Sequence, residues 1–346
     1  MLGNFFINLR TGIYVISVNG KPTDFHMLQF LILVVGLAMV VFGANILVDG
    51  SSALAKRFKI PNIVIGLTIV AFGTSSPELA ISTYSAWTGN SEIAIGNVVG
   101  SNVFNILLIL GISALITPLT ILRNTVLKEI PLSLLAALVL YVMINDTTLN
   151  EGTTNIISRG DGIILLGFMA IFMYYLVHLA KTSGEDEDLE IPDFSTSKSS
   201  LYIVGGLALL VGGGKLFVDS AVNLATAFGM SQAVIGLTIV AAGTSMPELA
   251  TSVVAALKKN SDIAVGNVVG SNIFNVFLIL GLSSLVSPLQ KGNITDIDLW
   301  VCIGASLLLL LSGYLFGKFK ITKTEGVIFI LCYILYVAFQ IGQLQN

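Results

Sequence analysis

The chain has 346 residues, of which 55% are hydrophobic and only 11% are charged. Soluble globular domains carry about 25% charged residues, so this composition excludes an ordinary soluble domain. The formal net charge is only −3, and no basic patch indicates nucleic-acid binding. Apolar runs of about 20 residues recur along the whole chain, and each is long enough to cross a bilayer. We therefore predict a polytopic membrane protein.

The apolar runs predict ten membrane-spanning helices and leave little sequence for a soluble domain. In chain order, they are expected at residues 27–49, 61–87, 92–116, 124–145, 161–181, 200–224, 231–257, 262–287, 297–317 and 325–344. Residues 1–26 lack a cleavage-site pattern and are interrupted by Arg10, so we interpret them as an N-terminal extension, with an eleventh span as the alternative. Cys302 and Cys332 fall in predicted spans and have neither zinc nor disulfide spacing.

Lysine and arginine residues in the loops predict the orientation of the chain. If the segment before the first span lies outside, the cytoplasmic loops hold twelve basic residues and the outer loops hold four. Cytoplasmic loops of membrane proteins are enriched in basic residues. We therefore expect a multi-pass protein of the cell (inner) membrane with both termini outside.

The second predicted span contains the sequence GTSSPELA, residues 73–80. A proline within a helix removes an amide donor, and for Pro77 the carbonyl that loses its partner belongs to Gly73. We expect the helix to open here and to leave carbonyls near Ala71 to Thr74 without helical partners. At membrane depth such carbonyls are tolerated only where they line an enclosed or wet cavity, in which they can bind cations.

Glu78 follows this break directly. A carboxylate within a membrane is costly, by at least ~2.5 kcal/mol, so we expect it to face the protein interior. Thr74 lies four residues earlier on the same helical face, and Ser75 adds a hydroxyl. Together these side chains predict a polar site on the second span.

The third predicted span carries a polar stripe made of Asn97, Ser101 and Asn105, which recur at every fourth residue. Gly96 and Gly100 beside the stripe allow close approach of another helix. These polar residues either line the same site as Glu78 or only tie helices together by hydrogen bonds.

Residues 182–199, TSGEDEDLEIPDFSTSKS, are polar and acidic and show no apolar periodicity. We interpret this segment as an acidic linker on the cytoplasmic side of the membrane. It is either a solvated tether or a regulatory cation site, although its carboxylates lack the spacing of an EF-hand.

Residues 61–119 and 231–289 match without a gap, with about two thirds of the positions identical. The chain thus divides into a first repeat at 27–181 and a second repeat at 200–346, each with five spans. Five is an odd number, so the second repeat enters the membrane in the opposite orientation. Inverted repeats are typical of secondary transporters, whose substrate site lies between the repeats. The second copy of the polar motifs comprises Thr244, Ser245, Pro247, Glu248, Asn267, Ser271 and Asn275.

The combined motifs supply two carboxylates, two amides, several hydroxyls and the freed carbonyls, and none of these proposed ligands is a histidine, cysteine or methionine. Oxygen ligands of this kind suit hard cations such as Ca²⁺, Na⁺ and Mg²⁺. Two carboxylates can neutralise one divalent ion or two monovalent ions. One pocket could therefore bind each kind of ion in turn, as exchange requires.

The two copies of GTS-x-PE and GN-x-x-GSN-x-x-N resemble the alpha repeats of the sodium/calcium exchanger family of cation/calcium antiporters, prokaryotic type. The resemblance covers residues 27–344 and implies an all-α polytopic membrane protein with ten transmembrane helices as two inverted five-helix repeats. It also implies Ca²⁺ and Na⁺ as transported substrates, no cofactor and no enzymatic activity. The implied ion-site residues are Ala71, Thr74, Ser75, Glu78, Ser101, Asn105, Ala241, Thr244, Ser245, Glu248, Ser271 and Asn275.

Within this family an acid at the position of Asn275 is associated with K⁺ transport, so the resemblance favours K⁺-independent exchange. With two acids in the site, one Ca²⁺ would be balanced and three Na⁺ would not, which implies electrogenic transport by alternating access. We expect a monomer. The alternatives are exchange of H⁺ for Ca²⁺ or another divalent cation by the same fold and, from another class, a passive cation channel.

Overall fold

The computed structural model describes residues 22–149, 154–182, 192–228, 241–316 and 319–344. Within these ranges, eight helices are long and apolar enough to cross a membrane, and a bent helix pair forms a ninth span. The shorter apolar helix Met246–Leu257 belongs to the remaining predicted span, whose first part lies outside the described residues. The predicted all-α membrane architecture is confirmed.

The first repeat contains five spans, several of which are assembled from consecutive helical segments. They are α1 (Pro22–Phe58); α2, η1, α3 and α4 (Asn62–Ile65, Gly66–Val70, Ala71–Thr74, Ser76–Trp87); α5, η2 and α6 (Ser91–Val103, Phe104–Leu110, Gly111–Ile116); η3 and α7 (Thr125–Glu129, Ile130–Met143); and α9 (Arg159–Thr182). The segments labelled η are π-helical. A short helix, α8 (Asp146–Leu149), follows the fourth span.

The second repeat has the same order of spans. They are α10 (Thr196–Ala227); α12 and α13 (Ala241–Thr244, Met246–Leu257); α14, η5 and α15 (Ser261–Phe274, Asn275–Leu280, Gly281–Val286); α16 and η6 (Asp296–Leu311, Ser312–Phe316); and α17 (Lys323–Leu344). The third and eighth spans are the most buried, whereas α9 and α17 expose most of their side chains. The polar stripes predicted from sequence therefore lie at the centre of the bundle.

Two helices begin a few residues before the predicted start of their repeat. Helix α1 begins at Pro22 instead of residue 27, because proline at the first helical position loses no hydrogen bond. Helix α10 begins at Thr196 instead of residue 200, because the Ser195 hydroxyl caps it by accepting from the Lys198 amide at 3.3 Å. Residues 1–21 of the predicted extension and 183–191 of the predicted linker lie outside the described residues.

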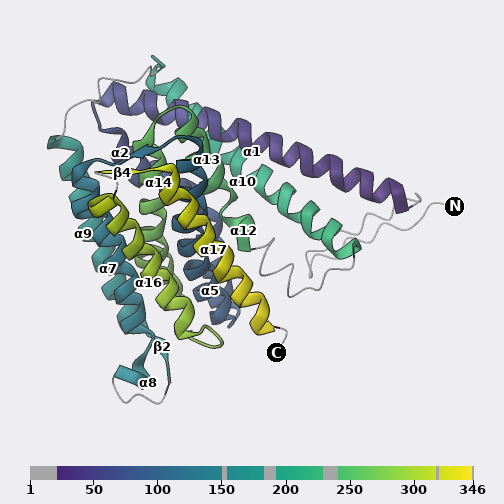
Figure 1. Cartoon of the computed structure of the whole chain (residues 1–346), viewed down its shortest axis with the longest axis vertical. Coiled ribbons are helices and arrows are strands. Elements are labelled where there is room, and N and C mark those ends of the chain that lie inside the picture. Colours follow the sequence, from purple (N-terminus) through teal and green to yellow (C-terminus); the bar gives the residue numbers. More distant parts are fainter. Residues whose placement is uncertain (1–21, 150–153, 183–191, 229–240, 317–318, 345–346) are drawn as a thin grey trace.

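Helices α1 and α10 lie side by side and run oblique to the other helices (Figure 1). Their contact is made by glycines spaced seven residues apart, Gly36 and Gly43 on α1 and Gly206 and Gly213 on α10. A Cβ atom added to Gly206 would lie 2.8 Å from the Gly43 carbonyl oxygen. The two backbones are thus as close as glycine allows, and the first spans of the two repeats form one antiparallel pair.

Two pairs of short antiparallel strands join the ends of the two repeats and were not predicted. Strand β1 (Leu119–Thr120) pairs with β4 (Lys320–Ile321), and β2 (Ile156–Ile157) pairs with β3 (Leu289–Gln290). Each pair links a strand of the first repeat to a strand of the second. The backbone hydrogen bonds thus fasten one repeat to the other beside the central helices.

Candidate functional site

The second and seventh spans are both interrupted at a serine that precedes the proline by two residues. Ser75 (φ −80°, ψ 6°) separates α3 from α4, and the two halves of the second span differ in direction by 48°. Ser245 (φ −90°, ψ 10°) separates α12 from α13 at the matching position. The predicted local opening before Pro77 and Pro247 is confirmed.

The opening is shorter than predicted. The Ser75 amide donates to the Ala71 carbonyl at 3.0 Å, and the Thr74 hydroxyl oxygen lies 3.3 Å from the same carbonyl oxygen. The expectation that the Ala71 carbonyl lacks a helical partner is therefore wrong, because the non-helical conformation is confined to one residue. Ala241 opens α12 at the equivalent position, and its side chain lies outside the described residues.

Each glutamate is buried and accepts a hydrogen bond from the serine of the other repeat. Glu78 and Glu248 are both only 1% exposed. The Ser75 hydroxyl donates to Glu248 Oε1 at 2.9 Å, and the Ser245 hydroxyl donates to Glu78 Oε1 at 3.1 Å. The two broken helices therefore meet at the boundary between the repeats, with each holding the carboxylate of the other.

The serines of the third and eighth spans complete this cluster. The Ser101 hydroxyl donates to Glu78 Oε1 at 3.5 Å, and Ser271 donates to Glu248 Oε1 at the same distance. The hydroxyl oxygens of Ser245 and Ser101 lie 3.0 Å apart, so both serines gather around the same carboxylate oxygen. Six of the predicted site residues thus form two equivalent buried hydrogen-bonded groups, one around each carboxylate.

Within the described residues, four buried side-chain oxygens of the predicted site residues have no hydrogen-bond partner. They are the second carboxylate oxygens of the two glutamates and the side-chain oxygens of two asparagines: Glu78 Oε2, Glu248 Oε2, Asn105 Oδ1 and Asn275 Oδ1. A buried acceptor without a partner is costly, so native proteins seldom keep one without a reason. Four such oxygens, two of them on carboxylates, fit the ligand preference of a hard cation.

Asn97 and Asn267 connect the threonines to the glutamates. Asn97 donates to the Glu78 carbonyl at 3.4 Å and accepts from the Thr244 hydroxyl at 3.4 Å. Asn267 likewise donates to the Glu248 carbonyl at 3.2 Å and accepts from the Thr74 hydroxyl at 3.1 Å. Each asparagine therefore links the glutamate of its own repeat to the threonine of the other.

Two serines of the site were missed by sequence reasoning. Ser82 accepts from Asn97 Nδ2 at 3.0 Å, and Ser252 accepts from Asn267 Nδ2 at 2.9 Å. Both lie four residues after a glutamate and are identical in the two repeats, which is the signal that could have identified them. Each serine thus extends the hydrogen-bond network that contains the glutamate of its own repeat.

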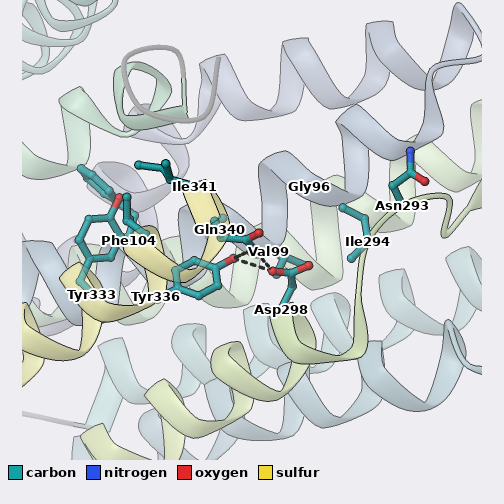
Figure 2. Close-up of a pocket in the computed structure, with 12 residues that line it drawn as sticks. Gly96, Val99, Phe104, Asn293, Ile294, Asp298, Tyr333, Tyr336, Gln340 and Ile341 are labelled. Carbon is teal, nitrogen blue, oxygen red and sulfur yellow. Dashed lines mark hydrogen bonds between the residues drawn. The ribbon is translucent and has the colours of Figure 1, made fainter. Parts of the chain in front are cut away.

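A separate cavity of about 340 Å³ lies between α5, the start of α16 and α17 (Figure 2). Gly96 and Gly100 line this cavity. Each directly precedes a member of the polar stripe, so the cavity lies about 100° around the helix from the stripe. Figure 2 shows Asp298 in its wall, where its carboxylate accepts from Tyr336 and Gln340. The amide and hydroxyl of Thr295 also donate to that carboxylate, so Asp298 serves as a helix cap with its acceptors occupied.

Comparison with known proteins identifies the family. The sequence model described as sodium/calcium exchanger protein matches residues 28–178 and again residues 198–342. The chain belongs to the sodium/calcium exchanger family. The two matches correspond to the two repeats, and together they cover all ten spans. The family consists of transporters, so the chain is a cation/Ca²⁺ exchanger by family and not an enzyme.

Several relatives match over nearly the whole chain. Inner membrane protein YrbG of Escherichia coli is 38% identical over 271 residues, covering 76% of this chain and 81% of YrbG. Sodium/calcium exchanger MaX1 of Methanosarcina acetivorans is 32% identical over 348 residues, covering 89% of this chain and 97% of MaX1. A structure of the sodium-calcium exchanger NCX_Mj soaked with Na⁺ and Ca²⁺ aligns with a TM-score of 0.77 and 34% identity, covering 90% of this chain and 98% of NCX_Mj.

Proposed function

We propose that this chain is a secondary-active antiporter that exchanges Na⁺ for Ca²⁺ across the membrane by alternating access. The observation that carries the proposal is the two buried glutamates, each held by a serine of the other repeat and each with one carboxylate oxygen that accepts no hydrogen bond within the described residues. Oxygen ligands of this kind bind Na⁺ and Ca²⁺ in preference to softer metals. The names of MaX1 and NCX_Mj, both sodium/calcium exchangers, support the same pair of ions.

The proposed ligands are the residues that the sequence motifs indicate. Glu78 and Glu248 supply the charge that both ions share, and Asn105 and Asn275 supply amide oxygens. The hydroxyls and backbone oxygens beside the glutamates complete the coordination: Ala71, Thr74, Ser75, Ser101, Ala241, Thr244, Ser245 and Ser271. The hydroxyls that now donate to Glu78 Oε1 and Glu248 Oε1 would turn their oxygens toward the ion when it binds.

The charge of the site supports electrogenic, K⁺-independent exchange. Two carboxylates balance one Ca²⁺, whereas three Na⁺ ions bring one charge more. Asn275 is neutral and buried, and its amide donates to Asn102 Oδ1. The site therefore has no third carboxylate at the position that the K⁺-dependent branch uses.

Exchange of H⁺ for Ca²⁺ is the second candidate function. The observation that favours it is the burial of both glutamates, since a carboxylate in a low-dielectric site can take up a proton. Protons and Na⁺ would then compete for the same two side chains.

Flux measurements on purified protein in liposomes distinguish these functions. We expect uptake of radiolabelled Ca²⁺ when Na⁺ is loaded inside, and no uptake when only a pH gradient is present. Uptake should be faster when the liposome interior is positive, because three Na⁺ leaving for each Ca²⁺ entering carry net positive charge outward. Ca²⁺ uptake driven by the pH gradient would favour the second candidate. Ca²⁺ flux that follows the membrane potential without any counter-ion would contradict exchange and indicate a channel.

We also propose that the chain is a monomer of the cell membrane with both termini outside. The excess of basic residues in the proposed cytoplasmic loops and the name of YrbG support this arrangement. The exposed Arg57 would lie inside and the exposed Thr88 outside. After Cys302→Ala and Cys332→Ala, an impermeant thiol reagent added to intact cells should label Thr88→Cys and spare Arg57→Cys, and the opposite pattern would reverse the orientation.

A further inference from the structure

Four asparagines form a reciprocal network where the third and eighth spans meet. Asn102 Nδ2 donates to the backbone carbonyl of Asn272 at 3.3 Å, and Asn272 Nδ2 donates to the backbone carbonyl of Asn102 at 3.1 Å. Asn105 Nδ2 then donates to Asn272 Oδ1 at 3.0 Å, and Asn275 Nδ2 donates to Asn102 Oδ1 at 2.9 Å. All four are at most 3% exposed, so no bulk water competes for these bonds.

The direction of every bond in this network is fixed by a backbone carbonyl. A carbonyl can only accept, so Asn272 must turn its amide nitrogen toward Asn102 and its side-chain oxygen away. That oxygen can also only accept, so Asn105 must turn its own nitrogen toward Asn272. The oxygen of Asn105 is then left pointing away from the network, without a partner among the described residues. The equivalent series of hydrogen bonds through Asn102 likewise leaves Asn275 Oδ1 without a partner among the described residues.

This directionality matters because an asparagine amide can present either of two opposite groups. Its oxygen can bind a cation, whereas its nitrogen, rotated by 180°, would place two hydrogens against the ion. Neither Asn105 nor Asn275 controls this choice by itself. The choice is made for each of them by an asparagine of the other repeat.

We propose that Asn102 and Asn272 are positioning residues that hold the Asn105 and Asn275 amides with oxygen toward the bound cation. The inference rests on the proposed function, since it assigns the two freed oxygens to the Na⁺/Ca²⁺ site. Tying the helices together would require only that hydrogen bonds form. It would not require that each series of hydrogen bonds end in a buried side-chain oxygen that has no partner among the described residues.

A double-mutant cycle tests this role separately from helix packing. Asn272→Leu removes both the donor and the acceptor while keeping a similar side-chain volume. Asn105→Asp replaces the amide by a carboxylate whose two oxygens are equivalent, so its orientation no longer needs a partner. Ca²⁺ affinity is measured by isothermal titration of the full-length chain in detergent without Na⁺.

In the parent chain, Asn272→Leu should weaken Ca²⁺ binding by about tenfold or more, the usual effect of losing a charge-assisted contact. In the Asn105→Asp background, the same substitution should cause no loss. The carboxylate of that variant has no hydrogen to donate to Asn272 Oδ1, so replacing Asn272 removes no orienting hydrogen bond. Equal losses in both backgrounds would show that Asn272 acts only through packing and would overturn the inference.

Asn145→Leu is the matched control, because Asn145 is also a buried asparagine but is bonded to Tyr141 and Lys291 at the outer end of the fourth span. It should lower the melting temperature and leave the Ca²⁺ affinity unchanged. A parent chain that binds no Ca²⁺ would contradict the proposed function itself. That result is distinct from a parent that binds Ca²⁺ and a cycle that shows no coupling.

Discussion

At the level of single residues, the site is built from contacts that cross between the repeats. Ser75 of the first repeat holds Glu248 of the second, and Ser245 of the second holds Glu78 of the first. The threonines also bond across the repeats, since Thr244 donates to Asn97 and Thr74 donates to Asn267. Neither repeat alone therefore forms a complete site.

Removing one of these hydroxyls should weaken ion binding. Ser75→Ala leaves Glu248 Oε1 without its 2.9 Å donor and removes a proposed ligand. A hydrogen bond to a charged group contributes about 1.5–3 kcal/mol, so we expect Ca²⁺ affinity to fall roughly tenfold to hundredfold. The Ca²⁺ dependence of Na⁺-driven uptake in liposomes measures this change.

Ser76→Ala is the control for that variant. The Ser76 hydroxyl donates to the Phe72 carbonyl within its own helix and does not contact a glutamate. It should leave the Ca²⁺ dependence within about twofold of the parent, since the lost bond is local. If the two alanine variants weaken Ca²⁺ binding equally, the crossed serine contact has no special role.

The sequence could predict the residue types of the site but not their partners. Helical spacing predicts Thr74 and Glu78 on one face, because neighbours four residues apart share a face in a continuous helix, whereas here Ser75 interrupts the helix between them. It could not show that Ser75 bonds the distant Glu248, since that contact depends on how two helices dock. The same limit explains why Asn102 and Asn272 were not among the predicted site residues.

At the level of secondary structure, the close contact of α1 and α10 sets how the first spans of the two repeats can move. Gly36 and Gly43 face Gly213 and Gly206 with almost no space for a side chain. Small residues at such spacing let membrane helices pack through their backbones. The proposed alternating access would therefore move the α1–α10 pair as one body against the helices that carry the ion site.

Gly206→Ala should disrupt this pair. The new Cβ atom would lie 2.8 Å from the Gly43 carbonyl and 2.9 Å from Leu47 Cβ, so the helices must separate. Overpacking of this kind costs typically about 1–3 kcal/mol, and we expect a lower melting temperature and slower Ca²⁺ uptake. Thermal unfolding in detergent and uptake in liposomes check both effects.

Gly205→Ala provides the control one residue away. A Cβ atom there would meet only Ile46 Cδ1, at 3.9 Å, so it fits without any shift. We expect the melting temperature and the uptake rate of the parent. Equal damage from both substitutions would mean that α10 is sensitive to any change in this region, and that the tight contact with α1 is not the cause.

The helix breaks could be predicted from sequence, whereas the π-helical segments could not. Proline removes a specific donor, so the openings before Pro77 and Pro247 follow from the residue itself. Segments η2 and η5 begin beside Asn105 and at Asn275, in residues that have no distinctive composition. π-Helical turns often occur at functional sites, and here they follow from tertiary packing.

At the level of the whole molecule, the two repeats make equivalent contributions. The odd number of spans in each copy predicted the inversion, and the broken helices, asparagine network and strand pairs all occur as matched sets. An inverted pair of similar units can open to either side of the membrane by exchanging their conformations. This symmetry supports alternating access around a site that belongs to both repeats.

The central claim is that Glu78 and Glu248 form one site that binds Ca²⁺ and Na⁺ in turn. Equilibrium binding of radiolabelled Ca²⁺ to the purified chain, with increasing Na⁺, tests it most directly. The control is Glu92→Gln, because Glu92 is exposed at the N-terminal end of the third span, where its carboxylate accepts from Asn293 Nδ2. It should bind Ca²⁺ like the parent.

We predict one Ca²⁺ per chain, displaced cooperatively by Na⁺, and loss of this binding in Glu78→Gln and in Glu248→Gln alone. Each substitution removes half of the charge that balances the ion. Ca²⁺ binding that persists in either variant, or that Na⁺ cannot displace, would contradict a single shared site.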